Sequence, residues 1–215
     1  MGAARGLIVE GIPGSGKTST IRQLQKLPEF GQRESTSFLL FGEEITQRTL
    51  ELRNREGLLS VDDHESLLGE LLFPLEQQQK RFAERGWNGE EKDLQFLFLF
   101  ERFHLTHATY YSDLAGWNYQ PIEERLSNLS AKGCLLVMSP EVMQERIIDS
   151  RPFTRWRNYI ARYGDTNQAI IEHYVRQQEA LLREVKRSLL DWLVVDTTQA
   201  NWSLVASELW KYWNR

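Results

Sequence analysis

A glycine-rich stretch near the N-terminus carries the residue types that bind phosphate. Residues 11–18 read GIPGSGKT and match the pattern G-x-x-x-x-G-K-[ST] at every fixed position. Glycines let such a loop curl so that several backbone N–H groups point at one anion, and a following helix adds the positive end of its dipole. Lys17 would reach the outer phosphates of a nucleotide, and the Thr18 hydroxyl would bind Mg²⁺. The residues expected to hold the nucleotide are Gly11, Pro13, Gly14, Ser15, Gly16, Lys17, Thr18 and Ser19.

The sequence on either side of this loop supports the same interpretation. The apolar run Leu7–Val9 precedes it, and the helix-period segment STIRQLQKL follows it. A turn that only capped a helix would not require the lysine. The pattern therefore predicts a nucleotide phosphate site with ATP and Mg²⁺ as cofactors.

Two adjacent carboxylates follow the second apolar run, in the stretch FLLFGEE. Transfer of a phosphoryl group to a hydroxyl needs a carboxylate to accept the proton, and residues just beyond strand ends are well placed for this. Glu43 or Glu44 is therefore a candidate general base, with Glu43 preferred. The alternative is an ordinary acidic first turn of a helix.

A second charged pair, Glu101 and Arg102, ends the run FLFLF. Glu101 is expected to hold Mg²⁺ through water, and Arg102 to hold the acceptor or its phosphate. The alternative is a structural ion pair.

The segment after the fourth apolar run is rich in arginine. Pro152, Phe153 and Trp156 lie among these arginines and argue against a plain solvated helix. We expect residues 146–165 to form a lid that closes over a nucleotide, contacts its phosphates and excludes water. The arginines are Arg146, Arg151, Arg155, Arg157 and Arg162.

Short apolar runs alternate with longer helix-period segments along the whole chain. This alternation predicts an α/β fold with a mainly parallel sheet, strands buried on both faces and ligands at their carboxyl ends. The last helix carries an apolar stripe, Trp202 to Trp213, that we assign to the core, and residues 84–93 are expected to form a loop. The predicted strands are Leu7–Val9, Phe38–Phe41, Leu94–Phe100, Leu135–Met138 and Leu193–Val195.

Composition excludes several classes of protein. The 215 residues suit one domain, 1–215, and the net charge of −4 argues against long nucleic acids as partners. No stretch approaches the roughly 18 apolar residues of a membrane span, so a cytoplasmic protein without membrane contact is expected. The absence of an N-K-x-D motif argues against a GTPase switch, and the four histidines are assigned to the surface or the core.

Taken together, the stretches IVEGIPGSGKTS, FLLFGEE, FERFHLTHATYYSDL, LLVMSPEVMQERI and LVVDTTQ resemble the deoxynucleoside kinases and thymidylate kinases, a group of P-loop phosphotransferases. The resemblance implies a three-layer fold with a five-stranded parallel sheet of order 2-3-1-4-5, flanked by helices. It implies that Glu43 or Glu44 is the base, that Glu101 and Arg102 act with Mg²⁺ and the acceptor, and that Arg151 and Arg155 are the lid arginines. Homodimers are common in this group.

The acceptor stays open because the sequence departs from the pattern of the group. Phe103 and His104 stand where a small hydroxyl residue is usual, and the Asp-Arg and Ala-Asp-Arg motifs of thymidylate kinases do not occur. A glutamine among residues 77–79 is a candidate for reading a base, although a helical surface run is the simpler interpretation. The sequence thus predicts an ATP-dependent kinase for a nucleoside, a nucleotide or a similar small molecule. The alternatives are an antibiotic or sugar phosphotransferase, and a non-catalytic nucleotide-binding regulatory protein.

Overall fold

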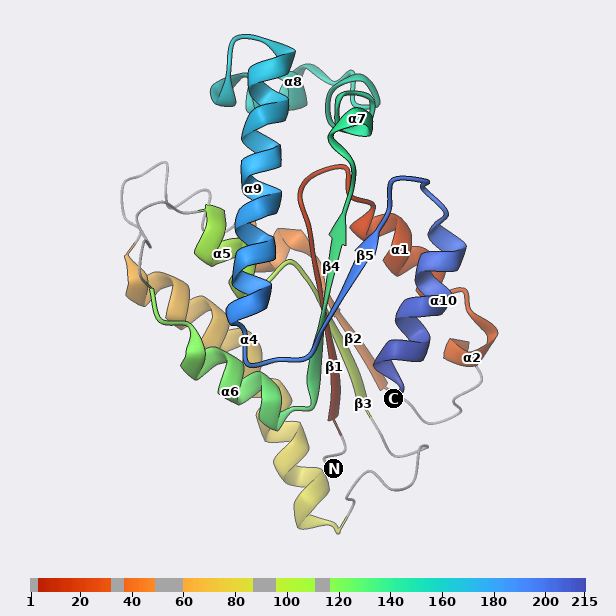
Figure 1. The fold of residues 1–215 in the computed structure, drawn as a ribbon. Helices are drawn as coiled ribbons and strands as arrows, with labels where there is room; N and C mark the ends of the chain where they lie inside the picture. The colour runs from red at the N-terminus through yellow and green to blue at the C-terminus, as the bar shows by residue number, and fades with distance from the viewer. Residues whose placement is uncertain (1–3, 32–36, 49–59, 87–95, 111–116) are drawn as a thin grey trace.

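Five parallel strands form the centre of the molecule in a computed structural model that describes residues 4–31, 37–48, 60–86, 96–110 and 117–215. The sheet order is β2-β3-β1-β4-β5, and helices cover both faces (Figure 1). All five predicted strands and the predicted order are confirmed. The strands are β1 (Ala4–Glu10), β2 (Ser37–Phe41), β3 (Phe96–Glu101), β4 (Ala131–Val137) and β5 (Trp192–Asp196).

The register of the sheet brings the predicted functional segments to one edge. Val9 of β1 pairs with Glu101 of β3, and Phe41 of β2 pairs with Phe100. The glycine-rich loop therefore leaves β1 directly beside the end of β3, and the segment with Glu43 leaves β2 beside the same point. Parallel strands place their carboxyl ends on one side, so three segments distant in sequence meet there.

Helices pack against the sheet in two layers. Those on one face include α4, α5, α6 and α9, while α1 and α10 lie on the other face (Figure 1). The helices and helical turns are α1 (Lys17–Leu24), α2 (Pro28–Gly31), η1 (Glu44–Arg48), α4 (Val61–Glu84), α5 (His104–Tyr110), α6 (Gln120–Asn128), α7 (Pro140–Met143), η4 (Gln144–Asp149), α8 (Thr154–Ile160), η5 (Ala161–Tyr163), α9 (Asn167–Arg187) and α10 (Trp202–Trp213).

Side-chain caps fix where the longer helices begin. Ser60 and Asp63 form a reciprocal capping box at the start of α4, where the Ser60 N–H donates to the Asp63 carboxylate at 2.8 Å. The Thr166 hydroxyl accepts from the backbone N–H of Ala169 at the start of α9. Each cap satisfies a backbone donor that has no partner within its helix.

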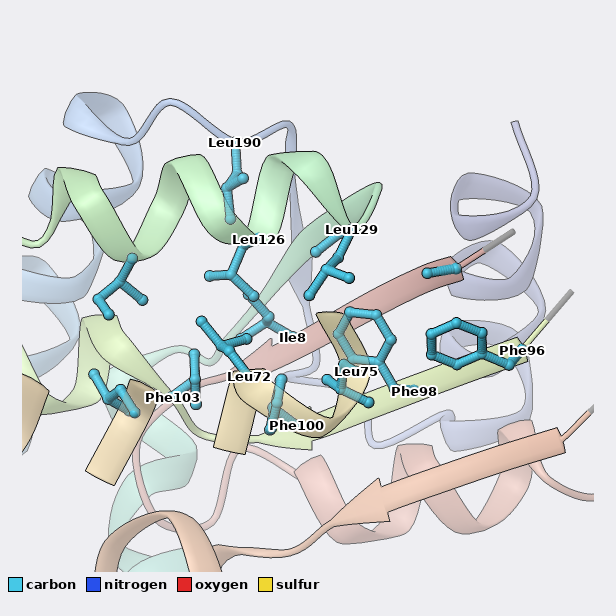
Figure 2. Close-up of a cluster of buried hydrophobic side chains, with 14 residues drawn as sticks. Ile8, Leu72, Leu75, Phe96, Phe98, Phe100, Phe103, Leu126, Leu129 and Leu190 are labelled. Carbon is cyan, nitrogen blue, oxygen red and sulfur yellow. The ribbon is translucent and has the colours of Figure 1, made fainter. Parts of the chain in front are cut away.

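A core rich in phenylalanine holds β3 and β1 against α4 and α6 (Figure 2). Phe100 stacks on Phe103 with ring centroids 4.1 Å apart. Figure 2 shows Leu72 and Leu75 of α4 and Leu126 of α6 in the same cluster, between the helices and the strands. This packing fixes the end of β3, from which Glu101 and Arg102 project.

The structure corrects two sequence predictions, the burial of the edge strands and the start of the loop at 84–93. The edge strands are partly exposed, with Leu39 of β2 and Val194 of β5 each 44% exposed, because each pairs with a neighbour on one side only within the described residues. Helix α4 extends to Glu84, so the predicted loop at 84–93 starts later, and residues 87–95 with Leu94 lie outside the described residues. None of the described helices is long and apolar enough to cross a membrane.

Candidate active site

A cleft of about 1200 Å³ opens above the carboxyl ends of the strands. Its walls come from the glycine-rich loop, the segments after β2 and β3, the arginine-rich segment 146–165 and the start of α10. Figure 1 shows α7 and α8 beyond the strand ends, at the top of the view. The lining residues include Pro13, Gly14, Gly16, Lys17, Thr18, Ser19, Glu43, Glu101, Arg102, Arg146, Arg151, Phe153, Arg155, Trp156, Arg162 and Trp202.

The glycine-rich loop needs its glycines for conformation and for space. Gly14 and Gly16 have φ angles of 81° and 90°, which side chains rarely tolerate. A Cβ atom on Gly16 would also lie 2.0 Å from the ring of Trp202. The loop therefore takes the curled form expected of a phosphate-binding loop. Gly11 and Ser15, which were expected to hold the nucleotide, do not line the cleft. Their carbonyl oxygens accept hydrogen bonds from Lys17 and Thr197.

Lys17 is 5% exposed and is held by the loop itself. Its Nζ donates to the carbonyl oxygens of Gly11 at 2.9 Å and of Ile12 at 3.1 Å. Burial, together with the nearby Arg102 cation, lowers the pKa of Lys17 to about 7. A bound polyphosphate would supply the negative charge that favours the protonated lysine.

Thr18 and Glu101 meet across the sheet although they are 83 residues apart. The Thr18 hydroxyl donates to Glu101 Oε1 at 2.7 Å. Hydroxyl and carboxylate oxygens are the donors that Mg²⁺ prefers, and Mg²⁺ usually takes few protein ligands and completes its shell with water and phosphate oxygens. These two residues therefore fit the predicted cation site. Within the described residues there is no group of three or more His, Cys, Asp or Glu side chains that could hold a metal alone.

Arg102 and Glu43 form a partly buried pair beside the cation site. Arg102 Nε lies 3.4 Å from Glu43 Oε2, and the guanidinium lies over the Tyr110 ring at 5.3 Å. Burial disfavours the Arg102 cation, but Tyr110 and Glu43 outweigh that effect, so the pKa of Arg102 is raised. Arg102 also has a φ of 61°, an unusual conformation for a non-glycine residue that aims its side chain into the cleft.

The structure places the two candidate bases differently. Glu43 lines the cleft, whereas Glu44 begins η1, is exposed and does not line the cleft. The difference follows from geometry, because consecutive residues at the start of a helical turn point in different directions.

Sequence analysis missed Glu10, the last residue of β1, which is fully buried beneath the cleft. Its carboxylate accepts hydrogen bonds from the backbone N–H groups of Phe103 at 2.9 Å and Thr106 at 3.2 Å, and from the Thr106 hydroxyl. Burial raises the pKa of Glu10, although these hydrogen bonds oppose that effect. Glu10 thus ties β1 to the segment that follows Arg102. An acidic residue at the end of an otherwise apolar strand was the available signal.

The arginine-rich segment forms the outer wall of the cleft. Arg151 lies over the Trp156 ring at 4.6 Å, and Arg162 lies over the Tyr159 ring at 3.8 Å. Arg155 is exposed and lines the cleft, whereas Arg157 does not line it. The two predicted lid arginines, Arg151 and Arg155, are therefore both at the cleft.

Trp202 belongs to the cleft wall and not to the core stripe predicted for it. The rest of that stripe is buried against α1 and β5, as predicted. Trp202 is the first residue of α10 and lines the cleft, where its ring lies beside Gly16 and 5.3 Å from the guanidinium of Arg146. Arg146 in turn donates to the carbonyl oxygens of Thr197 and Thr198, each at 2.8 Å. The tryptophan thus links the glycine-rich loop to the arginine-rich segment.

No family model matches the sequence, and no curated protein matches it. Similarity is found among solved structures. Shikimate kinase from Acinetobacter baumannii, in complex with shikimate, matches with a TM-score of 0.50 and 16% identity over 97% of this chain and 92% of that chain. The YorR protein of Bacillus subtilis, in complex with phosphorylated GDP, matches with a TM-score of 0.52 and 15% identity over 96% and 94%. Thymidylate kinase from Candida albicans matches with a TM-score of 0.50 and 16% identity over 97% and 90%.

These neighbours share the strand order and the helices on both faces of the sheet, and they cover nearly the whole chain. At 15–16% identity they establish the fold and leave the substrate open. The resemblance to nucleoside and nucleotide kinases drawn from the sequence is thereby confirmed at the level of the fold. The chain has the fold of the P-loop kinases.

Proposed function

We propose that this protein is an ATP- and Mg²⁺-dependent phosphotransferase acting on a small-molecule acceptor of nucleoside or nucleotide type. The observation that carries the proposal is the convergence of one lysine and two pairs of residues on one cleft. A lysine held by the loop, a hydroxyl–carboxylate pair and a carboxylate–guanidinium pair lie at the ends of neighbouring strands. Two of these groups match positions that the sequence pattern of P-loop kinases assigns to nucleotide binding.

Each residue has a distinct role in the proposed reaction. The loop N–H groups and Lys17 would hold the β- and γ-phosphates and stabilise charge that develops during transfer. Thr18 and Glu101 would hold Mg²⁺, which neutralises phosphate charge when it is bound. Arg102 would orient the acceptor, and Glu43 would accept the proton from its hydroxyl group.

The arginine-rich segment would complete the site. Arg151 and Arg155 line the same cleft as the loop, where their guanidinium groups can contact phosphate oxygens. The exposed Phe153 and the neighbouring Trp156 offer apolar surface in the same wall. A segment of this kind can exclude water, which suppresses hydrolysis of the nucleotide.

A screen for ATP consumption tests the function and identifies the acceptor class. The acceptors are nucleosides, nucleoside monophosphates, nucleoside-like antibiotics and small hydroxylated carboxylates, the last because one structural neighbour binds shikimate. Lys17→Ala serves as the inactive control. We expect ADP formation that depends on one acceptor set, requires Mg²⁺ and is lost in the control.

Two other results would redirect the assignment. Turnover of an antibiotic alone would support a specialised phosphotransferase on the same fold. Tight ATP binding by calorimetry without turnover of any acceptor would contradict the kinase proposal and support a nucleotide-binding regulatory protein.

A further inference from the structure

Three elements that do not line the cleft themselves, η1, α4 and α5, are joined by buried hydrogen bonds that the proposed reaction does not use directly. His64 of α4 and His107 of α5 lie with their Nδ1 atoms 2.9 Å apart. His107 Nε2 lies 2.8 Å from the carbonyl oxygen of Thr46 in η1. His107 is fully buried and His64 is 1% exposed, so water does not compete for these contacts.

The partners determine where the protons lie. A carbonyl oxygen only accepts, so Nε2 of His107 must carry a proton. The Nδ1 atom of a neutral His107 then accepts, which requires His64 to donate from its own Nδ1. Burial lowers the pKa of both imidazoles, that of His107 to about 3, which is consistent with neutral rings at physiological pH. The two histidines therefore hold opposite tautomers.

Thr46 connects this pair to the reacting groups. Its hydroxyl donates to the backbone carbonyl of Glu101 at 2.9 Å, so one residue is fixed to β3 by its side chain and to α5 by its carbonyl. The N–H groups of Ile45 and Thr46 both donate to the carbonyl of Gly42, which closes a turn around Glu43. The position of Glu43 relative to Arg102 thus depends on where Thr46 is held.

We propose that His107, oriented by His64, is a positioning residue that fixes Glu43 against Arg102 through Thr46. The inference rests on the proposed function only in assigning Glu43 the role of base. An apolar side chain would fill the same volume without the desolvation cost of two imidazoles. The hydrogen-bonded pair instead fixes the orientation of the Thr46 carbonyl, which a hydrophobic contact would not do.

The neighbouring His104 provides a contrast on the same helix. It is also fully buried, but its Nε2 lies 3.0 Å from Glu123 of α6, and Glu123 is further bonded to the segment at Ser188 and Leu189. Among the described residues, no hydrogen bond joins His104 to Thr46, and the interaction of His104 with His107 is electrostatic. A substitution at His104 therefore reports on loss of a buried polar group without disturbing the turn.

The kinetic experiment compares His107→Phe, His107→Gln and His104→Gln on the acceptor found in the screen. We expect His107→Phe to lower kcat about 10- to 100-fold, because a displacement of the Glu43 carboxylate by about 1 Å has an effect of this size. The KM for ATP should stay nearly unchanged, since the glycine-rich loop does not move. His107→Gln should restore most of kcat, since its amide can donate to the Thr46 carbonyl. His104→Gln should keep kcat within about threefold of the original protein. Equal kcat values for His107→Phe and His104→Gln would overturn the proposal.

A spectroscopic experiment decides the question without turnover. Long-range ¹H–¹⁵N correlation spectra of the imidazoles should show His64 protonated at Nδ1 and His107 at Nε2. The Arg102 Nε–H resonance, which reports the pair with Glu43, should shift in His107→Phe or His64→Phe and stay in place in His104→Gln. The reverse tautomers, or an unmoved Arg102 resonance, would refute the positioning role even if the protein were no kinase. An inactive protein with the expected spectra would refute the function and keep the positioning.

Discussion

The two walls of the cleft are built in different ways. The wall formed by the strand ends is buried, with Lys17, Glu101 and Arg102 each at most 9% exposed. Lys17 is bonded to carbonyl oxygens of its own loop, Glu101 to Thr18, and Arg102 is paired with Glu43. The wall formed by the arginine-rich segment is open to solvent. Phe153 is 71% exposed, and Arg151 and Arg162 lie over aromatic rings, with Arg162 also donating to the Tyr163 hydroxyl at 2.7 Å.

The difference indicates that the two walls have different roles. Buried polar groups need defined partners, and such partners preorganise charge where it is useful. Contacts between an exposed cation and a ring contribute only about 0.5–1 kcal/mol and tolerate rearrangement. The inner wall is therefore suited to chemistry, and the outer wall to enclosing ligands of variable shape.

The largest effect is expected at the centre of the inner wall. Lys17→Ala should lower kcat about a thousandfold, because a single preorganised donor to the transferring group has an effect of this order. The exposed Lys26 at the end of α1 offers a matched control, and Lys26→Ala should leave kcat unchanged within about twofold. Steady-state kinetics on both variants measure this. A Lys17→Ala protein that retained activity would remove the basis for treating the inner wall as catalytic.

The adjacent glutamates give the next largest contrast. Glu43→Gln should lower kcat about a hundredfold, the usual contribution of a general base, whereas Glu44→Gln should change it less than about threefold. The reason is that only Glu43 lines the cleft and pairs with Arg102. Pre-steady-state measurement of product formation separates this effect from product release. Equal losses in both variants would contradict the assignment of the base.

The buried histidines should make the inner wall sensitive to acid. The pKa of His107 falls from 6.5 to about 3 on folding, so the unfolded chain binds a proton that the folded chain does not. The stability associated with a neutral, buried His107 is fully present above about pH 6.5 and is lost as the pH falls toward 3. Between pH 7 and pH 5 the free energy of unfolding should fall by about 2 kcal/mol on account of His107.

Urea unfolding at the two pH values, in the original protein and in His107→Gln, isolates this term. The variant should lose about 2 kcal/mol less on acidification. Nearby charged and titratable groups are Asp63 next to His64, and His104 on the same helix as His107. Identical pH dependence in both proteins would show that folding does not lower the pKa of His107.

The smallest effect is expected on the outer wall. Arg155→Ala should raise the KM for ATP about fivefold with little change in kcat, because an exposed guanidinium adds modest and screened attraction to phosphate. Arg157→Ala, on the same helix but outside the cleft, is the matched control and should have no effect. Raising the salt concentration should reduce the difference between the two variants. A loss as large as that of Lys17→Ala would show that the two walls are not distinct.

Local sequence patterns were sufficient for the strands, their parallel arrangement and the glycine-rich loop after β1. Buried strands of a parallel sheet are continuous apolar runs, and the loop depends on glycine and lysine at fixed spacing, so both leave a local record. Arg151 and Arg155 could be predicted as lid residues because arginines and aromatic residues are concentrated in one segment. Their places in the cleft follow from how that segment packs over the strand ends.

Local patterns could not separate Glu43 from Glu44, and they placed Trp202 in the core. Both questions depend on which way a side chain points once the segment is packed. They likewise gave no sign that His64, His107 and Thr46 meet, since 43 residues separate the two histidines and 61 separate His107 from Thr46.

Local sequence features were enough to predict the α/β class, the parallel strands and a glycine-rich loop, because hydrophobic periodicity and glycine spacing act over a few residues, whereas the strand order came from the resemblance to the P-loop kinases. What only the tertiary structure decided was the set of partners: Thr18 with Glu101, Arg102 with Glu43, and His107 with Thr46. Those pairs arise where separate strands end at one edge of the sheet. The strength of these interactions depends on burial and on hydrogen-bond geometry, and neither is defined until the chain has folded.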